Sequence, residues 1–345
     1  MRLKWNANII SVRAVEQGLF PLDKQWHLDT SAYTRDLACQ MVWLSGLLPY
    51  EQCQRVFKTI GERWVSASSI WRQTQRHGTR LQASVEGQRE HVSVERIQLP
   101  DAKHDHNQRK GVSMDGGMVN IRGEGWRELK VGTVFDVEIR LERNPQTQVL
   151  DEMAHGTQMH YTAVLGSKDD FRPALWALAV QHDLPTARNR SVVADGALWI
   201  WDVAEDICPD GQQVVDWFHA VEHLSAAAHA LYPHPHDGVK RNGWLKTHKD
   251  LLYMGRIHTI IAVLKQRGFP QFATYFQRHQ RRMRYLEFRE QGLPIGSGTV
   301  ESGVKQFKQR LSGTGMRWNC DNANRMLVIR SAVLGDDFHQ LWQTA

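Results

Sequence analysis

The order of strand-like and helix-like segments beyond Gly111 is the feature that most constrains the fold of this chain. Apolar residues there recur with the two-residue period of β-strands, interrupted by stretches with helical spacing. In chain order, the expected elements are strands at 112–122, 129–140 and 160–166, a helix at 170–182, a strand at 191–194, a helix at 197–207 and a strand at 213–217. Short connections favour an antiparallel meander of the first three strands, whereas strands separated by helices should run parallel.

This β-β-β-α-β-α-β order predicts an α/β protein with the mixed sheet of the RNase H-like fold, in which helices cover the parallel strands. Beyond residue 218 the spacing becomes almost wholly helical, which predicts an all-α insertion, and a glycine-rich break precedes a last core helix at 299–311. We therefore expect four parts. Residues 1–110 contain an N-terminal arm, a helical region and a polar linker at 83–110. The first part of the core is 111–217, the insertion is 218–292, and the final core helix with a basic C-terminal region is 293–345.

The N-terminal region has helical spacing from 30 to 82 and predicts three short helices, the last at 69–77. That last helix carries Arg72, Gln73 and Arg76, long polar side chains of the kind that read DNA bases. Three short helices that end in such a segment predict a helix-turn-helix. A small helical bundle with a solvated last helix is the alternative.

The overall charge favours a polyanionic partner. Lys and Arg number 43 against 37 for Asp and Glu, which gives a formal charge of +6. The four cysteines stand far apart without a CxxC pair, which argues against a zinc ribbon and against a disulfide framework. No apolar run approaches the roughly 20 residues that span a bilayer. We therefore expect a cytoplasmic protein with no membrane partner.

An Asp-Gly pair occurs at two of the predicted strands. Asp115 lies among apolar residues of the first strand, and Asp195 ends the strand at 191–194. A carboxylate in such surroundings is costly to desolvate unless a cation neutralises it. For each aspartate alone, the beginning of a tight turn is an equally good interpretation. Their shared arrangement in this order of elements favours a paired role.

Glu301 lies in the first turn of the last predicted core helix, where the helix dipole favours a negative side chain. Lys305, Lys308 and Arg310 follow on later turns, and such a basic helix beside an acidic pocket suits phosphate groups. Three carboxylates are hard oxygen ligands, which match a pair of Mg²⁺ ions better than histidine or cysteine would. Mn²⁺ could substitute for Mg²⁺.

Several segments in one order resemble bacterial insertion-sequence transposases of the ISKra type, a group related to the Mutator-like DDE transposases. The segments are MDGGMVNIRGEGW at 114–126, VADG at 193–196, DWFHAVEHL at 216–224 and IGSGTVES at 295–302. The likeness covers about 111 to 334, although family members usually have a longer N-terminal region.

The resemblance implies that Asp115, Asp195 and Glu301 are the metal-binding catalytic triad. It also implies that Asp216 and His219 form the D-x-x-H signature of Mutator-like proteins. Because imidazole titrates near neutral pH, we expect His219 to contact phosphate or order the site, and the alternatives are a proton carrier and a core histidine. The segment GTGMRW at 313–318 looks like the C-terminal motif of the family. Arg317 and Trp318 in this segment could clamp and stack on DNA, and a core position is an equally good interpretation of a tryptophan at this spacing.

The function expected from these observations is that of a DNA transposase. It would cleave double-stranded DNA at terminal inverted repeats and join the freed ends to target DNA, with two Mg²⁺ ions per site and as a homodimer or higher assembly. One alternative is a related nuclease or resolvase without strand transfer, and another is a non-catalytic DNA-binding descendant. A third is a zinc metalloprotease, because 219–223 also fits the H-x-x-E-H motif.

Overall fold

The computed structural model of the protein describes residues 33–91, 108–144, 146, 148–296, 298–313 and 315–345, with the side chains of His91 and 298–301 excepted. The chain divides into two compact units, Met1–Arg80 and Leu81–Ala345. The sequence predicts a boundary between the N-terminal region and the core at residue 110. The two compact units instead meet between Arg80 and Leu81, inside helix α4 (Ala67–His91). The two units are described in turn.

The described part of the first unit is helical. Its elements are α2 (Arg35–Leu47), α3 (Tyr50–Thr59) and the beginning of α4 (Ala67–His91). The Thr34 side chain caps α2, and the Ser66 hydroxyl accepts a hydrogen bond from the Ser69 N–H at 3.1 Å at the start of α4. A small core of Met41, Cys53, Phe57, Val65 and Ile70 holds the helices together.

The prediction that α4 ends near His77 was wrong, because the helix has 25 residues and ends at His91. The residues that we interpreted as the start of a polar linker therefore belong to a helix. The stretch consists mostly of exposed or half-buried polar residues, and the Gln82 side chain donates to Glu86 one turn later at 2.8 Å. Polarity in this stretch reflects solvent exposure of the helix and not loss of helical structure.

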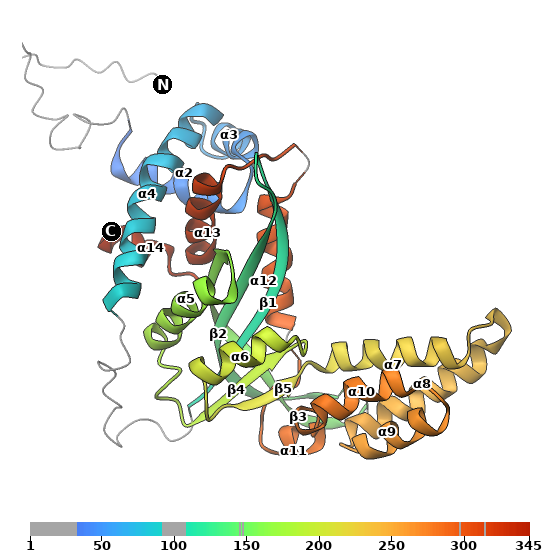
Figure 1. Ribbon diagram of the computed structural model, residues 1–345. Helices are drawn as coiled ribbons and strands as arrows, with labels where there is room; N and C mark the ends of the chain where they lie inside the picture. Colours follow the sequence, from blue (N-terminus) through green and yellow to red (C-terminus); the bar gives the residue numbers. More distant parts are fainter. Residues whose placement is uncertain (1–32, 92–107, 145, 147, 297, 314) are drawn as a thin grey trace, which may run out of the picture. The chain divides into compact units, whose positions relative to one another are not determined.

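The second unit is built on a five-stranded mixed sheet with strand order β3-β2-β1-β4-β5 (Figure 1). The strands are β1 (Arg109–Ile121), β2 (Gly125–Arg143), β3 (Leu150–Leu165), β4 (Asn189–Ala194) and β5 (Gln212–Val215). Strand β2 is antiparallel to β1 and β3, whereas β4 is parallel to β1 and β5. The predicted α/β class, meander and parallel strands are confirmed. Strand β3 begins at Leu150 and not at His160, because its first half is a largely polar edge segment without a strong apolar alternation.

Helices cover both faces of the sheet. They are α5 (Lys168–Gln181) and α6 (Leu198–Ile207) on one face, and α12 (Gly298–Leu311) and α13 (Cys320–Leu334) on the other. A Cβ atom at Gly132 would meet Leu175 of α5 at 2.7 Å, whereas one at Gly117 would meet Lys308 of α12 at 2.5 Å. Because side chains alternate along a strand, Asp115 projects from the same face as Gly117, the face that α12 covers.

The stretch after β5 contains only helices, as expected for an insertion. They are α7 (Trp217–Leu231), η2 (Pro235–Asp237), α8 (Gly238–Tyr253), α9 (Ile257–Gln266), α10 (Pro270–His279), η3 (Gln280–Arg282) and α11 (Tyr285–Glu290). The buried Tyr285 hydroxyl donates to the Val215 carbonyl at 2.9 Å, and apolar residues of these helices share one core with the sheet. The insertion therefore packs directly on β5. The chain ends with α14 (Phe338–Thr344).

Candidate active site

Three aspartates lie side by side across the parallel strands. Ser113 of β1 pairs with Val193 of β4, and Ala194 of β4 pairs with Val215 of β5. Continuing these registers aligns Asp115 with Asp195, and Asp195 with Asp216. The two later aspartates directly follow the carboxyl ends of their strands, where ligands of open α/β sheets commonly bind.

Asp115 is half-buried and has a raised pKa. Its Oδ1 accepts a hydrogen bond from the Gly116 N–H at 2.6 Å. Burial is the main cause of the raised pKa and the Asp195 carboxylate adds to it, whereas the Gly116 hydrogen bond, Lys308 and His219 lower it. The carboxylates of Asp115 and Asp195 are thus close enough to repel one another. A bound cation would relieve both the desolvation and the repulsion.

Asp195 directs the chain from β4 into α6. Its Oδ1 accepts from the Ala197 N–H at 2.8 Å, so the turn expected from Asp-Gly is present. Gly196 has a φ of +102°, and a Cβ atom there would lie 3.4 Å from both His279 and Tyr275. Glycine is therefore favoured both by the backbone conformation and by the neighbouring insertion helix α10.

Tyr275 of α10 reaches the site from the insertion. Its hydroxyl donates to the Asp195 carbonyl at 3.3 Å, and its ring stacks on His223 at a centroid distance of 3.5 Å. Burial, followed by the charges of Asp195 and Asp216, raises the pKa of Tyr275 well above its usual value, so the phenol stays a neutral donor. Sequence reasoning missed this residue, because no local pattern links it to an aspartate 80 residues earlier.

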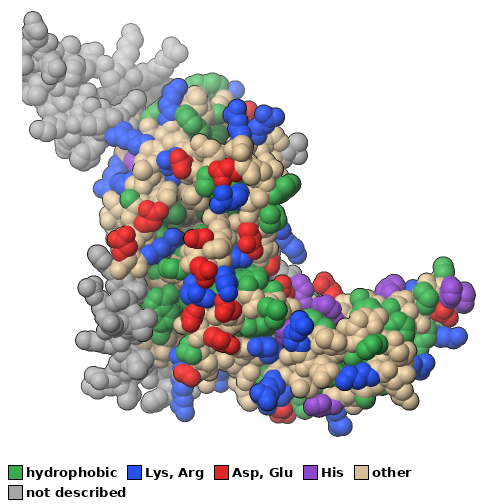
Figure 2. Space-filling view, in the orientation of Figure 1, with side chains coloured by type: hydrophobic (Ala, Val, Ile, Leu, Met, Phe, Trp, Pro, Cys, Tyr) green, Lys and Arg blue, Asp and Glu red, His purple; other side chains and the backbone are tan. Residues whose placement is uncertain are grey.

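Asp216 is fully buried at the start of α7 and acts as its N-cap. Its Oδ1 accepts from the His219 N–H at 2.9 Å, while its own N–H donates to the Ala194 carbonyl at 2.7 Å. The D-x-x-H spacing is thus the spacing of an N-cap and the third helical residue. It aims His219 at the site, with the ring Nδ1 3.2 Å from Glu222. Figure 2 shows histidine and acidic side chains close together on the surface between α12 and α7.

Glu301 occupies the first turn of α12, and its side chain lies outside the described residues. Val304 and Lys308, three and seven residues later, both lie over Gly117 of β1. Helical periodicity places the Glu301 position on the same face as these two residues. The helix therefore brings the Glu301 position and the Lys308 ammonium group to the side of β1 from which Asp115 projects.

The predicted DNA contacts of the C-terminal region divide into exposed and buried side chains. Lys305, Lys308 and Arg317 are exposed. Trp318 is buried, its Nε1 donates to the Leu311 carbonyl at 2.9 Å, and the guanidinium of the buried Arg310 lies 5.2 Å from its ring centre. The expectation that Trp318 stacks on DNA and that Arg310 faces phosphate is corrected, because both side chains are buried and Trp318 lies beside Ile121 of β1.

The predicted base-reading face of α4 needs a similar correction. Arg72 and Arg76 are exposed and one turn apart, whereas Gln73 is only 8% exposed. Residues at successive positions of a helix point in directions about 100° apart, so Gln73 turns inward while the two arginines stay in solvent. Only the arginines are available to a partner in this conformation.

The H-x-x-E-H segment does not assemble a metal site in the described structure. Among the described residues, one group of three ligating side chains lies within 4.8 Å, and it consists of His160, His182 and Asp337. His223 instead packs on Tyr275. Nor do the three aligned aspartates by themselves form such a group, so a metal at Asp115 and Asp195 depends on a further ligand such as Glu301.

A comparison of the sequence with protein-family models finds none that matches, and a comparison with curated proteins finds no match either. The resemblance to ISKra-type transposases therefore depends on the motifs quoted above. In the part of the chain that the structure describes, every helix is too short or too polar to cross a membrane.

Proposed function

We propose that this protein is a DDE-type DNA transposase with an RNase H-like core. The observation that carries the proposal is the register that aligns Asp115 with Asp195 on adjacent parallel strands. Helix α12 packs on the same face and carries Glu301 in its first turn. The strand order, with a meander joined to two parallel strands, is the arrangement we expect of an RNase H-like sheet.

The residues of the site fit Mg²⁺ or Mn²⁺. The donors are carboxylates, which hard divalent cations prefer. Burial and the neighbouring Asp195 carboxylate raise the pKa of Asp115, and a bound cation would favour the charged form of both carboxyl groups. Two bound ions would supply activation of the attacking oxygen and stabilisation of the leaving oxygen in phosphodiester transfer. Asp115, Asp195 and Glu301 would hold them.

Other residues of the chain would position the DNA. Lys308 extends over Gly117, where its ammonium group can neutralise a phosphate next to the carboxylates. His219 is held at the site by the N-cap of Asp216 and can donate to a phosphate oxygen. Tyr275, as a neutral donor to the Asp195 backbone, fixes the turn that carries this aspartate.

The proposed DNA surface extends from the site along α12. The exposed Lys305 and Arg317 would contact the backbone of the element end, and Arg72 and Arg76 of α4 would serve in end recognition as part of a helix-turn-helix. The DNA partners would be terminal inverted repeats and target DNA, held by a dimer or higher assembly. Short inverted repeats that bracket the gene would support this proposal.

The decisive assay combines purified protein, labelled DNA that carries the element end, and a target plasmid in Mg²⁺ buffer. Wild-type protein should nick at the repeat and join the 3′ end to the plasmid, and Asp195→Asn should lose both products. Asp210→Asn is the matched control, because Asp210 lies before β5, has a side chain 81% exposed and pairs only loosely with Arg190 at 3.6 Å. It should cleave and join normally.

The outcomes separate the proposal from its alternatives. Equal activity of the Asp195 variant and wild type would refute metal catalysis by this site. Cleavage without joining, lost in Asp195→Asn, would identify a nuclease or resolvase that uses the same carboxylates. Specific DNA binding without any cleavage would identify a non-catalytic DNA-binding protein.

A further inference from the structure

A second group of metal-ligating side chains lies where the C-terminal helices meet the sheet. His160 is on β3, His182 is the C-cap of α5, and Asp337 precedes α14. The Nδ1 atom of His160 is 2.8 Å from Oδ2 of Asp337, and Nε2 of His182 is 3.9 Å from the same oxygen. All three ligand atoms lie within 4.8 Å of one another. Elements far apart in the sequence thus converge on one point.

The donor set differs from that of the aspartate site. Two imidazole nitrogens and one carboxylate oxygen suit Zn²⁺ and similar transition-metal ions. Bonds of about 2.0–2.1 Å in tetrahedral geometry place neighbouring ligand atoms about 3.3 Å apart. The separations of 2.8 and 3.9 Å bracket this value. To point both nitrogens at one ion, the two imidazole rings would rotate out of the stacked arrangement in which their centroids lie 3.5 Å apart.

The surroundings of His182 indicate an unmet interaction. Its Nε2 is buried and makes no hydrogen bond with any described residue. A buried polar atom without a partner costs free energy, which a bound ligand would recover. The ring of His182 stacks on that of His160 at 3.5 Å, an arrangement that places both rings beside the Asp337 carboxylate.

Access and charge are compatible with a cation. The side chains of His160, His182 and Asp337 are 22%, 15% and 22% exposed, so the cluster lies near the surface, although the Nε2 atom of His182 is itself buried. The nearby Lys110 is paired with Asp136, and Asp183 adds a negative charge beside His182. Lys110 still lowers the pKa of His182, and Arg89 lines the pocket that Asp337 also lines, so the cluster has positive as well as negative neighbours.

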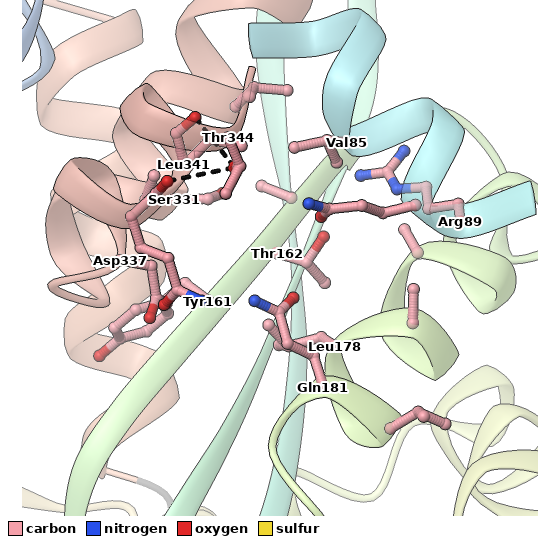
Figure 3. Close-up of a pocket in the computed structure, with 18 residues that line it drawn as sticks. Val85, Arg89, Tyr161, Thr162, Leu178, Gln181, Ser331, Asp337, Leu341 and Thr344 are labelled. Atoms are coloured by element: carbon pink, nitrogen blue, oxygen red, sulfur yellow. Dashed lines mark hydrogen bonds between the residues drawn. The ribbon is translucent and has the colours of Figure 1, made fainter. Parts of the chain in front are cut away.

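We propose that His160, His182 and Asp337 bind one Zn²⁺-class ion, which fastens α5 and the segment between α13 and α14 to β3. Three protein ligands leave a fourth position for water. Asp337 also lines a largely apolar pocket of about 450 Å³, between β3, α5 and the C-terminal helices (Figure 3). The open position would face this pocket. The site shares no ligand with the proposed active site and does not depend on transposase activity.

The test measures zinc binding by the full chain after metal is removed with a chelator. Because the protein has 17 histidines, a competing chelator is needed to suppress weak sites. Wild type should retain one equivalent of Zn²⁺ and unfold at a higher temperature with zinc than without. His182→Ala and Asp337→Asn should each weaken binding at least about tenfold. His155→Ala is the control, since His155 is on the same strand but pairs with Glu142 at 3.3 Å.

Cobalt provides a second readout that does not depend on stability. Co²⁺ bound in a low-coordinate site should give visible absorption in wild type and in His155→Ala but not in His182→Ala. A cooperative unfolding transition in chelator establishes that each variant folds. If His182→Ala does not fold, Asp337→Asn still tests the site, because asparagine has nearly the same size as aspartate. Equal zinc affinity in wild type and both ligand variants, or no stoichiometric zinc in wild type, would overturn the proposal. Asp195→Asn should keep the zinc, so failure of the transposase proposal is separately visible.

Discussion

Replacing Asp115 by asparagine should make the metal-free protein more stable. Burial, reinforced by the Asp195 carboxylate, raises the pKa of Asp115, so the folded chain holds this charge at a free-energy cost. For a carboxyl group with a raised folded pKa, that cost is fully present above the folded pKa, declines as the pH falls through it and disappears below the unfolded pKa of about 3.9. Asparagine removes the charge, while its amide oxygen can still accept from the Gly116 N–H.

The size of this gain in stability depends on how far neighbouring groups already offset the charge of Asp115. Stabilising substitutions commonly contribute about 0.5–2 kcal/mol. Asp115 is only half-buried, and Lys308 and His219 offset part of the cost, so we expect the lower part of this range, about 0.5–1 kcal/mol. For a unit of this size, that gain corresponds to a rise of roughly 1–4 °C in the melting temperature.

The assay is urea and thermal unfolding in chelator from pH 7.5 down to pH 4.5, where the gain should shrink. Saturating Mg²⁺ should reverse the ranking, because an ion at 100 times its Kd stabilises wild type by about 2.7 kcal/mol and the variant has lost a ligand. Asp210→Asn, at an exposed position, should have the stability of wild type in chelator and should be stabilised by Mg²⁺ as much as wild type. Destabilisation of Asp115→Asn in chelator, or equal stabilisation of both proteins by Mg²⁺, would refute the reasoning.

Three further predictions concern the α7 cap, the packing of α12 and the DNA surface. Asp216→Ala should destabilise by about 1 kcal/mol through loss of the α7 cap, whereas Asp216→Asn should be nearly neutral in urea unfolding; equal losses would contradict the cap. Gly303→Ala should cost about 1–3 kcal/mol, because its Cβ would lie 2.7 Å from the Tyr161 ring, and an unchanged unfolding midpoint would show that the ring moves aside. Replacing Arg72 and Arg76 by alanine should reduce the slope of log K for DNA against log salt by about 2 without changing stability; an unchanged slope would remove them from the DNA surface.

Sequence reasoning succeeded where the signal is local. The strands of the sheet were found because apolar runs alternate or end in Asp-Gly, and Asp115 and Asp195 were selected for their place in those runs. The helical insertion was found because its spacing is helical throughout. The sequence-based prediction was wrong for the first half of β3 and the second half of α4, because these segments are polar and show no clear periodicity of apolar residues.

Side-chain exposure could be decided only by the tertiary structure. Gln73, Arg310 and Trp318 have the chemistry of DNA contacts, yet all three are buried. A residue type specifies which interactions a side chain can make, but its neighbours determine whether solvent or a partner can reach it. Arg72 and Lys305, which have the same chemistry as Arg310, remain exposed.

The sequence alone determined the order of elements and the kinds of side chain available for chemistry. Only the tertiary structure decided which of them meet: the parallel register aligns Asp115, Asp195 and Asp216, and packing brings Asp337 to His160 across 177 residues of chain. The physical reason is that strand register and helix packing are set by the burial of apolar surface throughout the unit, so they depend on contacts that no local pattern contains.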